Sequence, residues 1–206
     1  TSTCRREPPT GRRTIDAAQP PRVPGDRGDP VSGRRPDQLV VVLGTGTEVG
    51  KTWVASHLLA HLRAAGVPVA ARKPAQSFDP GDPEPRDADV LGAATGEASP
   101  VVCPEHRWYE VAMAPPMAAD VLGRPPIALV DLVAEIAWPD GAAVGLVEGA
   151  GGVRSPIAHD ADHVDLLGAL LPDRVVLVAD AGLGTINGVR LSLDAVGDAT
   201  VVLNRF

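Results

Sequence analysis

Lysine is the scarcest charged residue of this chain. Of its 19 lysines and arginines, only Lys51 and Lys73 are lysines. The two cations differ wherever a compact ammonium must fit between phosphate oxygens, because a guanidinium is a wide planar fork. In a composition so biased toward arginine, we expect arginine at any position that only requires a positive charge. We therefore predict that Lys51 and Lys73 are phosphate ligands.

Aromatic residues, cysteines and long apolar runs are also scarce. Six aromatic residues in 206 predict a core of small side chains, as where helices pack on a sheet. Cys4 and Cys103 lack ligand spacing, which argues against a disulfide or zinc site and favours a reducing cytoplasm. No apolar run approaches the roughly 20 residues that cross a bilayer, and no signal-peptide pattern opens the chain. We expect a cytoplasmic location and no membrane partner.

Charge is distributed unevenly along the chain. Residues 1–37 contain eight arginines and five acidic residues, a net charge of +3, whereas the remainder carries −10. An acidic body argues against nucleic acid as a partner. The first 37 residues are rich in Pro, Arg and Gly and have no apolar periodicity, so we predict a disordered extension there. A folded domain is expected over residues 38–206.

From residue 38 onward, short β-branched runs alternate with helical stretches. The run at 39–43 has no polar alternation, as is typical of buried parallel strands. Further strands are expected at 67–72, 143–147, 174–179 and 200–203, and helices at 51–65, 87–95, 116–122, 129–138 and 185–196. This alternation predicts an α/β fold with an open, mostly parallel sheet and helices on both faces.

The strongest motif is GTGTEVGKT, residues 44–52, between the first strand and the first helix. Such a loop presents backbone N–H groups and a helix N-terminus to phosphate oxygens. Lys51 would bridge the β- and γ-phosphates, and the Thr52 hydroxyl would ligate Mg²⁺. The strict P-loop pattern has glycine at the position that Thr45 occupies here. Gly44, Gly46 and Gly50 also leave a dinucleotide-binding loop open, but the Gly-Lys-Thr ending favours a nucleoside triphosphate and the P-loop NTPase type of fold.

Charged residues also stand where later strands end. Glu148, in VEGAGG, follows a buried strand and suits Mg²⁺, while the glycines after it allow a substrate close to the backbone. Lys73 ends the second strand. Asp87 and Asp89 open a helix, where acidic residues are also favoured for structural reasons alone. A turn without a function would explain the glycines after Glu148, but it would not explain an acidic residue directly after a buried strand.

Two weaker patterns concern helix starts and histidines. The segment ADAGLGTIN, residues 179–187, predicts a second anion-binding helix N-terminus. His57 and His61 have a metal-compatible spacing, but a wet or packed helix face is the better interpretation. The polar cluster that ends at His163 is interpreted as a solvated loop and helix cap.

Together, GTGTEVGKT, KPAQS, DADVL, VEGAGG, ADAGLGTIN and VLNR resemble the dethiobiotin synthetase family in order and spacing, over about residues 39–206. The resemblance implies an ATP- and Mg²⁺-dependent homodimeric ligase that converts 7,8-diaminononanoate and CO₂ to dethiobiotin. It implies Mg²⁺ ligands at Thr52, Asp89 and Glu148, and catalytic roles for Lys51, Lys73, Thr47 and Glu48. The implied nucleotide-binding residues are Gly46, Thr47, Glu48, Val49, Gly50, Lys51, Thr52 and Asn204, and the implied substrate-binding residues are Ser77, Gly149, Ala150, Gly151, Gly184, Thr185 and Asn187.

Departures from the family pattern keep other functions open. Phe78 stands where the family usually has glycine, and Pro116 replaces a common histidine. The family continues past the position of Phe206 with a strand and a helix near the adenine. One alternative function is that of a switch-type ATPase, although such proteins need a second lysine where this chain has Gly46. A second is an amidating ligase, which normally needs a glutaminase domain. A third is an inactive truncated paralogue that acts as a binding or dimerisation module.

Overall fold

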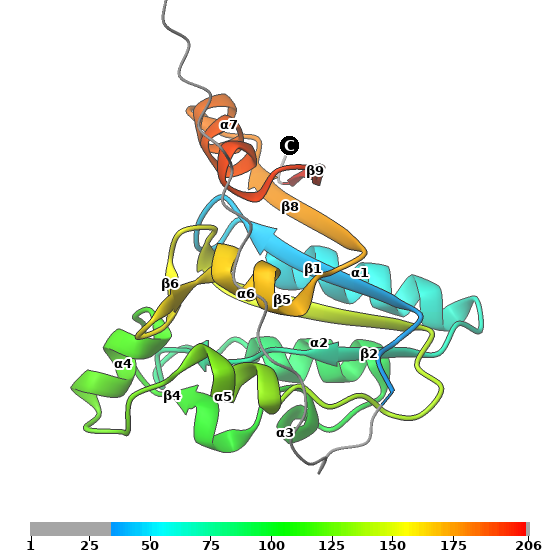
Figure 1. The fold of residues 1–206 in the computed structure, drawn as a ribbon, viewed down its shortest axis with the longest axis horizontal. Coiled ribbons are helices and arrows are strands. Elements are labelled where there is room, and N and C mark those ends of the chain that lie inside the picture. Colours follow the sequence, from blue (N-terminus) through cyan, green and yellow to red (C-terminus); the bar gives the residue numbers. More distant parts are fainter. Residues whose placement is uncertain (1–33, 205–206) are drawn as a thin grey trace, which may run out of the picture. The chain divides into compact units, whose positions relative to one another are not determined.

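A computed structural model describes residues 34–204, and its centre is a five-stranded parallel sheet with strand order β2-β5-β1-β8-β9 (Figure 1). The strands of this sheet are β1 (Gln38–Gly44), β2 (Val69–Arg72), β5 (Val144–Gly152), β8 (Arg174–Asp180) and β9 (Thr200–Asn204). Strand pairing in this order, with a helix in each crossover between parallel neighbours, confirms the predicted open α/β sheet. The carboxyl ends of β1, β2 and β5 therefore lie side by side.

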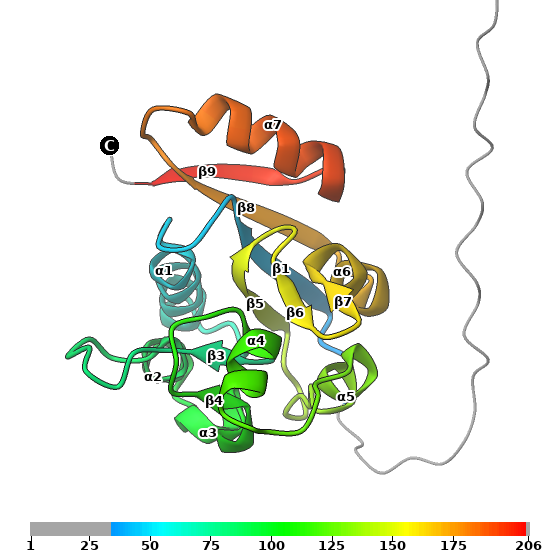
Figure 2. The same ribbon diagram turned by 90° about the vertical axis from the view of Figure 1, so that its left-hand side faces the viewer.

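Helices connect the strands and cover both faces of the sheet (Figure 2). They are α1 (Lys51–Ala64), α2 (Asp87–Thr95), α3 (Ser99–Val102), the 3₁₀ turn η1 (Glu105–Arg107), α4 (Pro115–Val121), α5 (Leu129–Ala134), α6 (His163–Leu170) and α7 (Thr185–Val196). Two small sheets complete the domain, one formed by β3 (Gln76–Ser77) with β4 (Trp108–Tyr109) and one by β6 (Pro156–Ala158) with β7 (Ala161–Asp162).

The apolar residues of β1 are divided between the two faces of the sheet. Val40 and Val42 pack in a core cluster with residues of α1 and α2. Leu39, Val41 and Leu43 pack in another cluster with residues of α6 and α7. Successive side chains of a strand point to opposite faces, so a strand covered on both sides must be apolar throughout. Each such Val or Leu contributes about 1.5–3 kcal/mol of hydrophobic free energy.

Several element boundaries differ from the predicted ones. β5 runs to Gly152 because its glycines continue the parallel pairing with β1, where Gly44 lies opposite Gly152. α5 ends at Ala134 rather than at 138, and the carbonyl of Ala137 instead accepts a hydrogen bond from Arg72. The short strands β3, β4, β6 and β7 were not predicted, because three or fewer residues carry no periodicity that a sequence pattern can reveal. The sequence analysis also gave no range for α6, of which it expected only the cap.

The predicted extension lies mostly outside the described residues, since the structure describes none of residues 1–33. Within its last four residues, Pro36 is buried, and Arg35 donates to the carbonyl of Leu171 and to Asp173 at 2.7 and 3.1 Å. These residues pack against the domain. Over residues 34–204, no helix combines the length and the apolarity needed to cross a lipid bilayer.

Candidate active site

The phosphate loop joins β1 to α1 through residues in unusual backbone conformations. Glu48 has φ of 58° and Gly50 has φ of 90°, both in the left-handed region, and Gly50 is the N-cap of α1. Gly44 has no room for a side chain, since a Cβ there would lie 2.8 Å from Cγ2 of Val49. The loop turns tightly enough for Lys51 Nζ to donate to the carbonyl of Gly46 at 2.9 Å. This shape leaves the start of α1 open toward a ligand.

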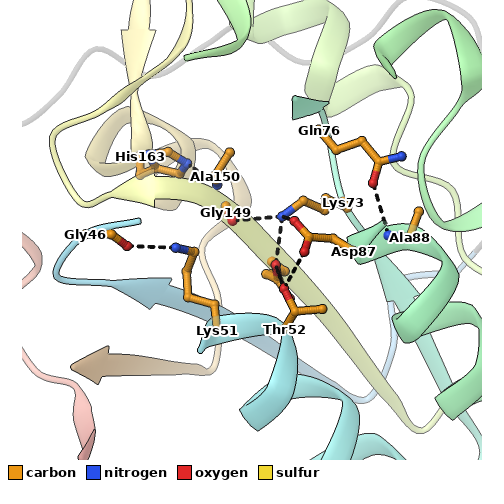
Figure 3. A network of polar contacts seen from close by, with 11 residues as sticks. Gly46, Lys51, Thr52, Lys73, Gln76, Asp87, Ala88, Gly149, Ala150 and His163 are labelled. Atoms are coloured by element: carbon orange, nitrogen blue, oxygen red, sulfur yellow. Dashed lines mark hydrogen bonds and ion pairs between the residues drawn. The ribbon is translucent and has the colours of Figure 1, made fainter. Parts of the chain in front are cut away.

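The second half of the site is a cluster of charged side chains, with Lys73 directly after β2, Glu148 within β5 and Asp87 at the start of α2 (Figure 3). Lys73 Nζ lies 2.7 Å from Asp87 Oδ2 and 2.7 Å from Glu148 Oε1. Thr52, the second residue of α1, places its hydroxyl 2.7 Å from Asp87 Oδ1 and 2.8 Å from Glu148 Oε1. Three elements and the start of α2 thus deliver four polar groups to one point.

Burial and charge set the protonation of these groups. Burial works to lower the pKa of Lys73, but the adjacent carboxylates of Asp87 and Glu148 outweigh it and raise the pKa above the usual value. Burial would raise the pKa of Asp87, yet the Lys73 ammonium holds it below its usual value. For Glu148, which is fully buried, burial prevails and raises the pKa. Lys73 and Asp87 are therefore an ion pair, and Glu148 is the group that accepts a proton most readily.

Lys51 is in the opposite situation. Burial, followed by repulsion from Lys73, lowers its pKa from 10.5 to about 8. The contact with the Gly46 carbonyl supplies no compensating charge. A buried ammonium without a carboxylate partner favours an anion beside it. Lys51 is therefore poised for a phosphate.

Asp87, rather than the predicted Asp89, reaches the charged cluster. Asp89 borders the same cavity, but its Oδ2 accepts from Arg86 Nε at 2.9 Å and its Oδ1 accepts from Ser99 Oγ at 2.6 Å. Successive helical residues point in directions about 100° apart, so residues two positions apart face different neighbours. The structure brings Asp87 to Thr52 and leaves Asp89 in the capping of α2.

The oxygen donors of this cluster fit a magnesium ion. Thr52 has a single hydroxyl proton, which cannot serve both carboxylate oxygens beside it. Glu148 Oε2 is buried and has no hydrogen-bond partner in the described part of the chain. Mg²⁺ binds through one or two carboxylates together with substrate phosphates rather than in an all-protein cage. Over residues 34–204, no group of three or more His, Cys, Asp or Glu residues that could hold a metal by itself is found.

A cavity of about 1140 Å³ opens beside the phosphate loop and the charged cluster. Ser77 lines it, and its buried hydroxyl, like the buried amide nitrogen of Gln76, has no partner among the described residues. Gln76 Oε1 accepts from the backbone N–H of Ala88 at 3.1 Å, which ties β3 to the start of α2. Ala150 and Gly151 form part of the opposite wall. The wall of the cavity thus contains buried polar groups without a hydrogen-bond partner among the described residues.

His163 is the residue of this region that the sequence analysis misjudged. It is buried, not solvated, and its Nε2 accepts from the backbone N–H of Ala150 at 2.9 Å. The helix cap is confirmed, since the Asp162 side chain accepts from the N–H groups of Val164 and Asp165, and His159 and Asp160 of the same cluster are exposed, as predicted. His57, by contrast, is exposed and stacks on Trp53, as predicted for a solvated helix face.

Two predicted binding segments lie apart from the charged cluster. Gly184 and Asn187, at the start of α7, are exposed and do not line the cavity, and the Thr185 hydroxyl donates to Asp180. Asn204, at the end of β9, donates to the carbonyl of Val49 in the phosphate loop at 3.1 Å. Asn204 is therefore beside the nucleotide end of the site.

Comparison with known proteins agrees with this geometry. A family model described as an AAA domain matches residues 38–205. An ATP-dependent dethiobiotin synthetase BioD from an Anaeromyxobacter species is 42% identical over 167 residues, covering 79% of this chain and 72% of that protein. The enzymes of the same name from Caulobacter vibrioides and Haloferax mediterranei are 41% and 39% identical, covering 75% and 80% of this chain and 72% and 71% of their own lengths.

This chain belongs to the dethiobiotin synthetase family. Membership decides between the two interpretations of the glycine-rich loop, because the family is ATP-dependent by name and the matching model is that of an AAA domain. Two of the departures noted in the sequence can be located in the structure. Phe78 lines the cavity, and Pro116 is buried in α4. The hydrogen bonds and ion pairs of the charged cluster join Thr52, Lys73, Asp87 and Glu148 and involve neither residue.

Proposed function

We propose that this protein is an ATP- and Mg²⁺-dependent ligase that forms dethiobiotin from 7,8-diaminononanoate and CO₂. One observation carries the proposal: Lys51, Lys73, Thr52 and Glu148 converge at the carboxyl edge of the sheet, beside a cavity of about 1140 Å³. Two ammonium groups and two oxygen donors at one point suit the terminal phosphates of a nucleotide. The cavity offers room for a second, smaller substrate next to them.

The reaction is a phosphoryl transfer followed by ring closure. CO₂ adds to one amine of the substrate and gives a carbamate, with loss of a proton. A carbamate oxygen attacks the γ-phosphorus of ATP, which gives a carbamic-phosphoric anhydride and ADP. The second amine then attacks the carbonyl carbon, and inorganic phosphate leaves as the ring closes. Such chemistry depends on positioning and on neutralisation of charge rather than on a strong base.

The residues of the site divide this work. Lys51 neutralises the β- and γ-phosphates, and Lys73 neutralises the γ-phosphate and the carbamate. Thr47 and Glu48 line the phosphate loop, whose backbone N–H groups would bind the phosphate chain. This assignment follows from the burial of both ammonium groups, because an anion gains most from a cation that water does not screen.

Magnesium would be held by Thr52, Asp87 and Glu148. The Thr52 hydroxyl oxygen lies 2.7 Å from Asp87 Oδ1 and 2.8 Å from Glu148 Oε1. When bound, the ion would supply neutralisation of the negative charge of the phosphates. Thr52 and Glu148 are the residues expected from the sequence, and Asp87 takes the place assigned to Asp89.

The remaining assignments concern the two ends of the site. Ser77, Gly149, Ala150 and Gly151 would contact the diamine, in keeping with the free Ser77 hydroxyl. The α7 start with Gly184, Thr185 and Asn187 would receive the substrate carboxylate of a partner subunit in a homodimer. Asn204 would contact adenine. A cytoplasmic enzyme with small-molecule substrates is the setting we propose, with neither nucleic acid nor a membrane as partner.

Release of phosphate from the purified protein tests the proposal. ATP, Mg²⁺ and bicarbonate are supplied with and without 7,8-diaminononanoate, and dethiobiotin is measured in parallel. The proposal expects phosphate only with the diamine, in equal amount to dethiobiotin. Phosphate without the diamine would instead support a switch-type ATPase, and no phosphate in either case would support an inactive binding module.

A further inference from the structure

His163 is a buried ionisable group for which the proposed reaction has no use. It is the first residue of α6 and only 1% exposed. Its place is fixed by the Asp162 cap, whose Oδ1 accepts from Val164 N at 2.7 Å, and by Asp165, which accepts from Asp162 N at 2.9 Å. A well-capped helix start holds its first side chain in a constant position.

The two ring nitrogens of His163 have different backbone partners. Nε2 faces the N–H of Ala150 at 2.9 Å, and Nδ1 faces the carbonyl of Ser155 at 2.9 Å. An N–H only donates and a carbonyl only accepts, so the ring must be neutral with its proton on Nδ1. In agreement, burial lowers the pKa of His163 to about 4. The ring is thus a fixed acceptor for Ala150.

The Ala150 N–H belongs to the same peptide group as the Gly149 carbonyl. That carbonyl accepts from Lys73 Nζ at 3.2 Å (Figure 3). Because a trans peptide is planar, its N–H and its C=O point in opposite directions. A peptide held at the N–H by His163 must therefore present its oxygen to Lys73.

Crowding keeps this peptide group in place. A Cβ on Gly149 would lie 2.6 Å from Cδ2 of His163 and 2.8 Å from Cδ2 of Leu43. The imidazole therefore packs directly against the Gly149 backbone. If the peptide were to flip, the Ala150 N–H would face the Lys73 ammonium, donor against donor. His163 disfavours that flip by accepting the N–H on the other side.

We propose that His163 is a positioning residue, which holds the Gly149–Ala150 peptide so that the Gly149 carbonyl fixes the Lys73 ammonium. The part of this inference that concerns turnover rests on the proposed function. The part that concerns the peptide group does not. His163 touches neither nucleotide nor substrate, and it acts through the backbone.

Two amide substitutions separate the contacts of the ring. The glutamine of His163→Gln carries an acceptor oxygen at the place of Nε2, and thus keeps the contact with Ala150. The asparagine of His163→Asn keeps only a donor at the place of Nδ1, and thus keeps the contact with Ser155 alone. His163→Phe fills the volume and keeps neither. His61→Gln and His61→Asn, on the exposed side of α1, are the matched controls.

Amide hydrogen exchange at Ala150 is the readout that needs no activity. We expect slow exchange in the wild-type protein and in His163→Gln, and fast exchange in His163→Asn and His163→Phe. Slow exchange in all four proteins would overturn the inference whatever the enzyme does. A purely structural role would also fail to separate the Gln and Asn variants.

Steady-state kinetics supply the second readout. For His163→Asn and His163→Phe, kcat is expected to fall by about 100-fold, as for a misplaced reacting group, while the KM for ATP stays unchanged. His163→Gln is expected to recover most of the lost turnover. Equal kcat in the Gln and Asn variants would overturn the inference. If the wild-type protein shows no diamine-dependent turnover while the exchange pattern holds, the proposed function fails and the peptide contact stands.

Discussion

Lys51 and Lys73 reach the same end of the sheet from different elements, one from the phosphate loop and one from the end of β2. Both are buried. Lys73 contacts two carboxylates, and its pKa is raised despite the cost of burial. Lys51 contacts only a neutral carbonyl, and its pKa falls to about 8. One ammonium is fully paired within the protein, and the other is left for an anion.

This difference separates two tasks that a phosphate site must perform. The phosphate loop has a positive charge whose burial is a cost until an anion arrives. In the charged cluster, Lys73 already has two carboxylate partners without a ligand. Under the proposed function, Mg²⁺ would bind there together with the nucleotide. Asp87 and Glu148 would then interact with the ion as well, and Lys73 would be able to contact an anion.

Replacement of each lysine by methionine tests the comparison most severely. Lys73→Met should lower turnover by about 100- to 1,000-fold, as expected when one charge-stabilising donor is lost. It should also lower the free energy of unfolding by about 3 kcal/mol, because Glu148 stays buried without its cation. Lys51→Met should lower turnover as much, yet leave the free energy of unfolding unchanged or higher. Urea unfolding and phosphate release measure the two quantities.

Equal losses of stability in the two methionine variants would break the comparison. It would mean that Lys51 has a carboxylate partner as strong as those of Lys73. Methionine is chosen because it keeps most of the apolar stem of lysine and therefore removes little packing.

The next largest effect concerns the two aspartates of α2. Asp87→Asn should raise the Mg²⁺ concentration needed for half-maximal turnover by about 10- to 100-fold, a loss that even an outer partner of a metal commonly causes. Asp89→Asn should leave that concentration unchanged, because its oxygens bind Arg86 and Ser99 instead. Asp89→Asn should instead lower the free energy of unfolding by about 1 kcal/mol, because Asp89 caps the start of α2. Titration of turnover with Mg²⁺ distinguishes the two, and the reverse order would restore Asp89 to the metal site.

A pair of glycine substitutions compares the site with the solvent side of α6. Gly149→Ala should destabilise the protein by about 1–3 kcal/mol, since its Cβ meets His163 and Leu43. Gly168→Ala, exposed within α6 and with nothing within 4 Å of its Cβ, should stabilise the protein by about 0.5–1 kcal/mol. Thermal or urea unfolding checks both signs. A stable Gly149→Ala protein with normal kcat would show that the loop has more room than the structure indicates.

The smallest expected effect is on the pH dependence of nucleotide affinity. Only the charged form of Lys51 attracts phosphate, and its pKa without ligand is about 8. As far as Lys51 sets it, affinity should therefore be constant well below pH 8 and fall above it by up to about tenfold per pH unit. Lys73 does not contribute there, since its pKa is raised. Lys51→Arg stays charged and should bind with no slope in this range. Calorimetric titration at several pH values measures the slope, and a slope in the arginine variant would exclude Lys51 as its source.

Most of the sheet and half of the site followed from the sequence because their signals are local. A run such as residues 39–43 is apolar on both faces, which only a covered parallel strand requires. Lys51 and Thr52 open the helix that follows such a strand, and Glu148 directly follows the apolar run of another. Parallel strands bring these ends together, so adjacency in space follows from position along each strand.

The remaining residues depend on how elements pack, which the sequence does not state. Asp87 and Asp89 are equally plausible at a helix start, and only the packing of α2 beside α1 selects which one faces Thr52. His163 lies in a polar stretch that is typical of a surface loop. It is buried because the hairpin of β6 and β7 returns α6 to the Gly149 backbone, an arrangement built from strands of three and two residues.

A crystal structure with a non-hydrolysable ATP analogue, Mg²⁺ and 7,8-diaminononanoate is the most direct test. The account predicts that Lys51 Nζ leaves the Gly46 carbonyl for the terminal phosphates, and that Thr52, Asp87 and Glu148 surround the metal. Lys73 Nζ should lie between the terminal phosphate and the substrate amine, still held by the Gly149 carbonyl. A complex in which either ammonium points away from the phosphates would contradict it.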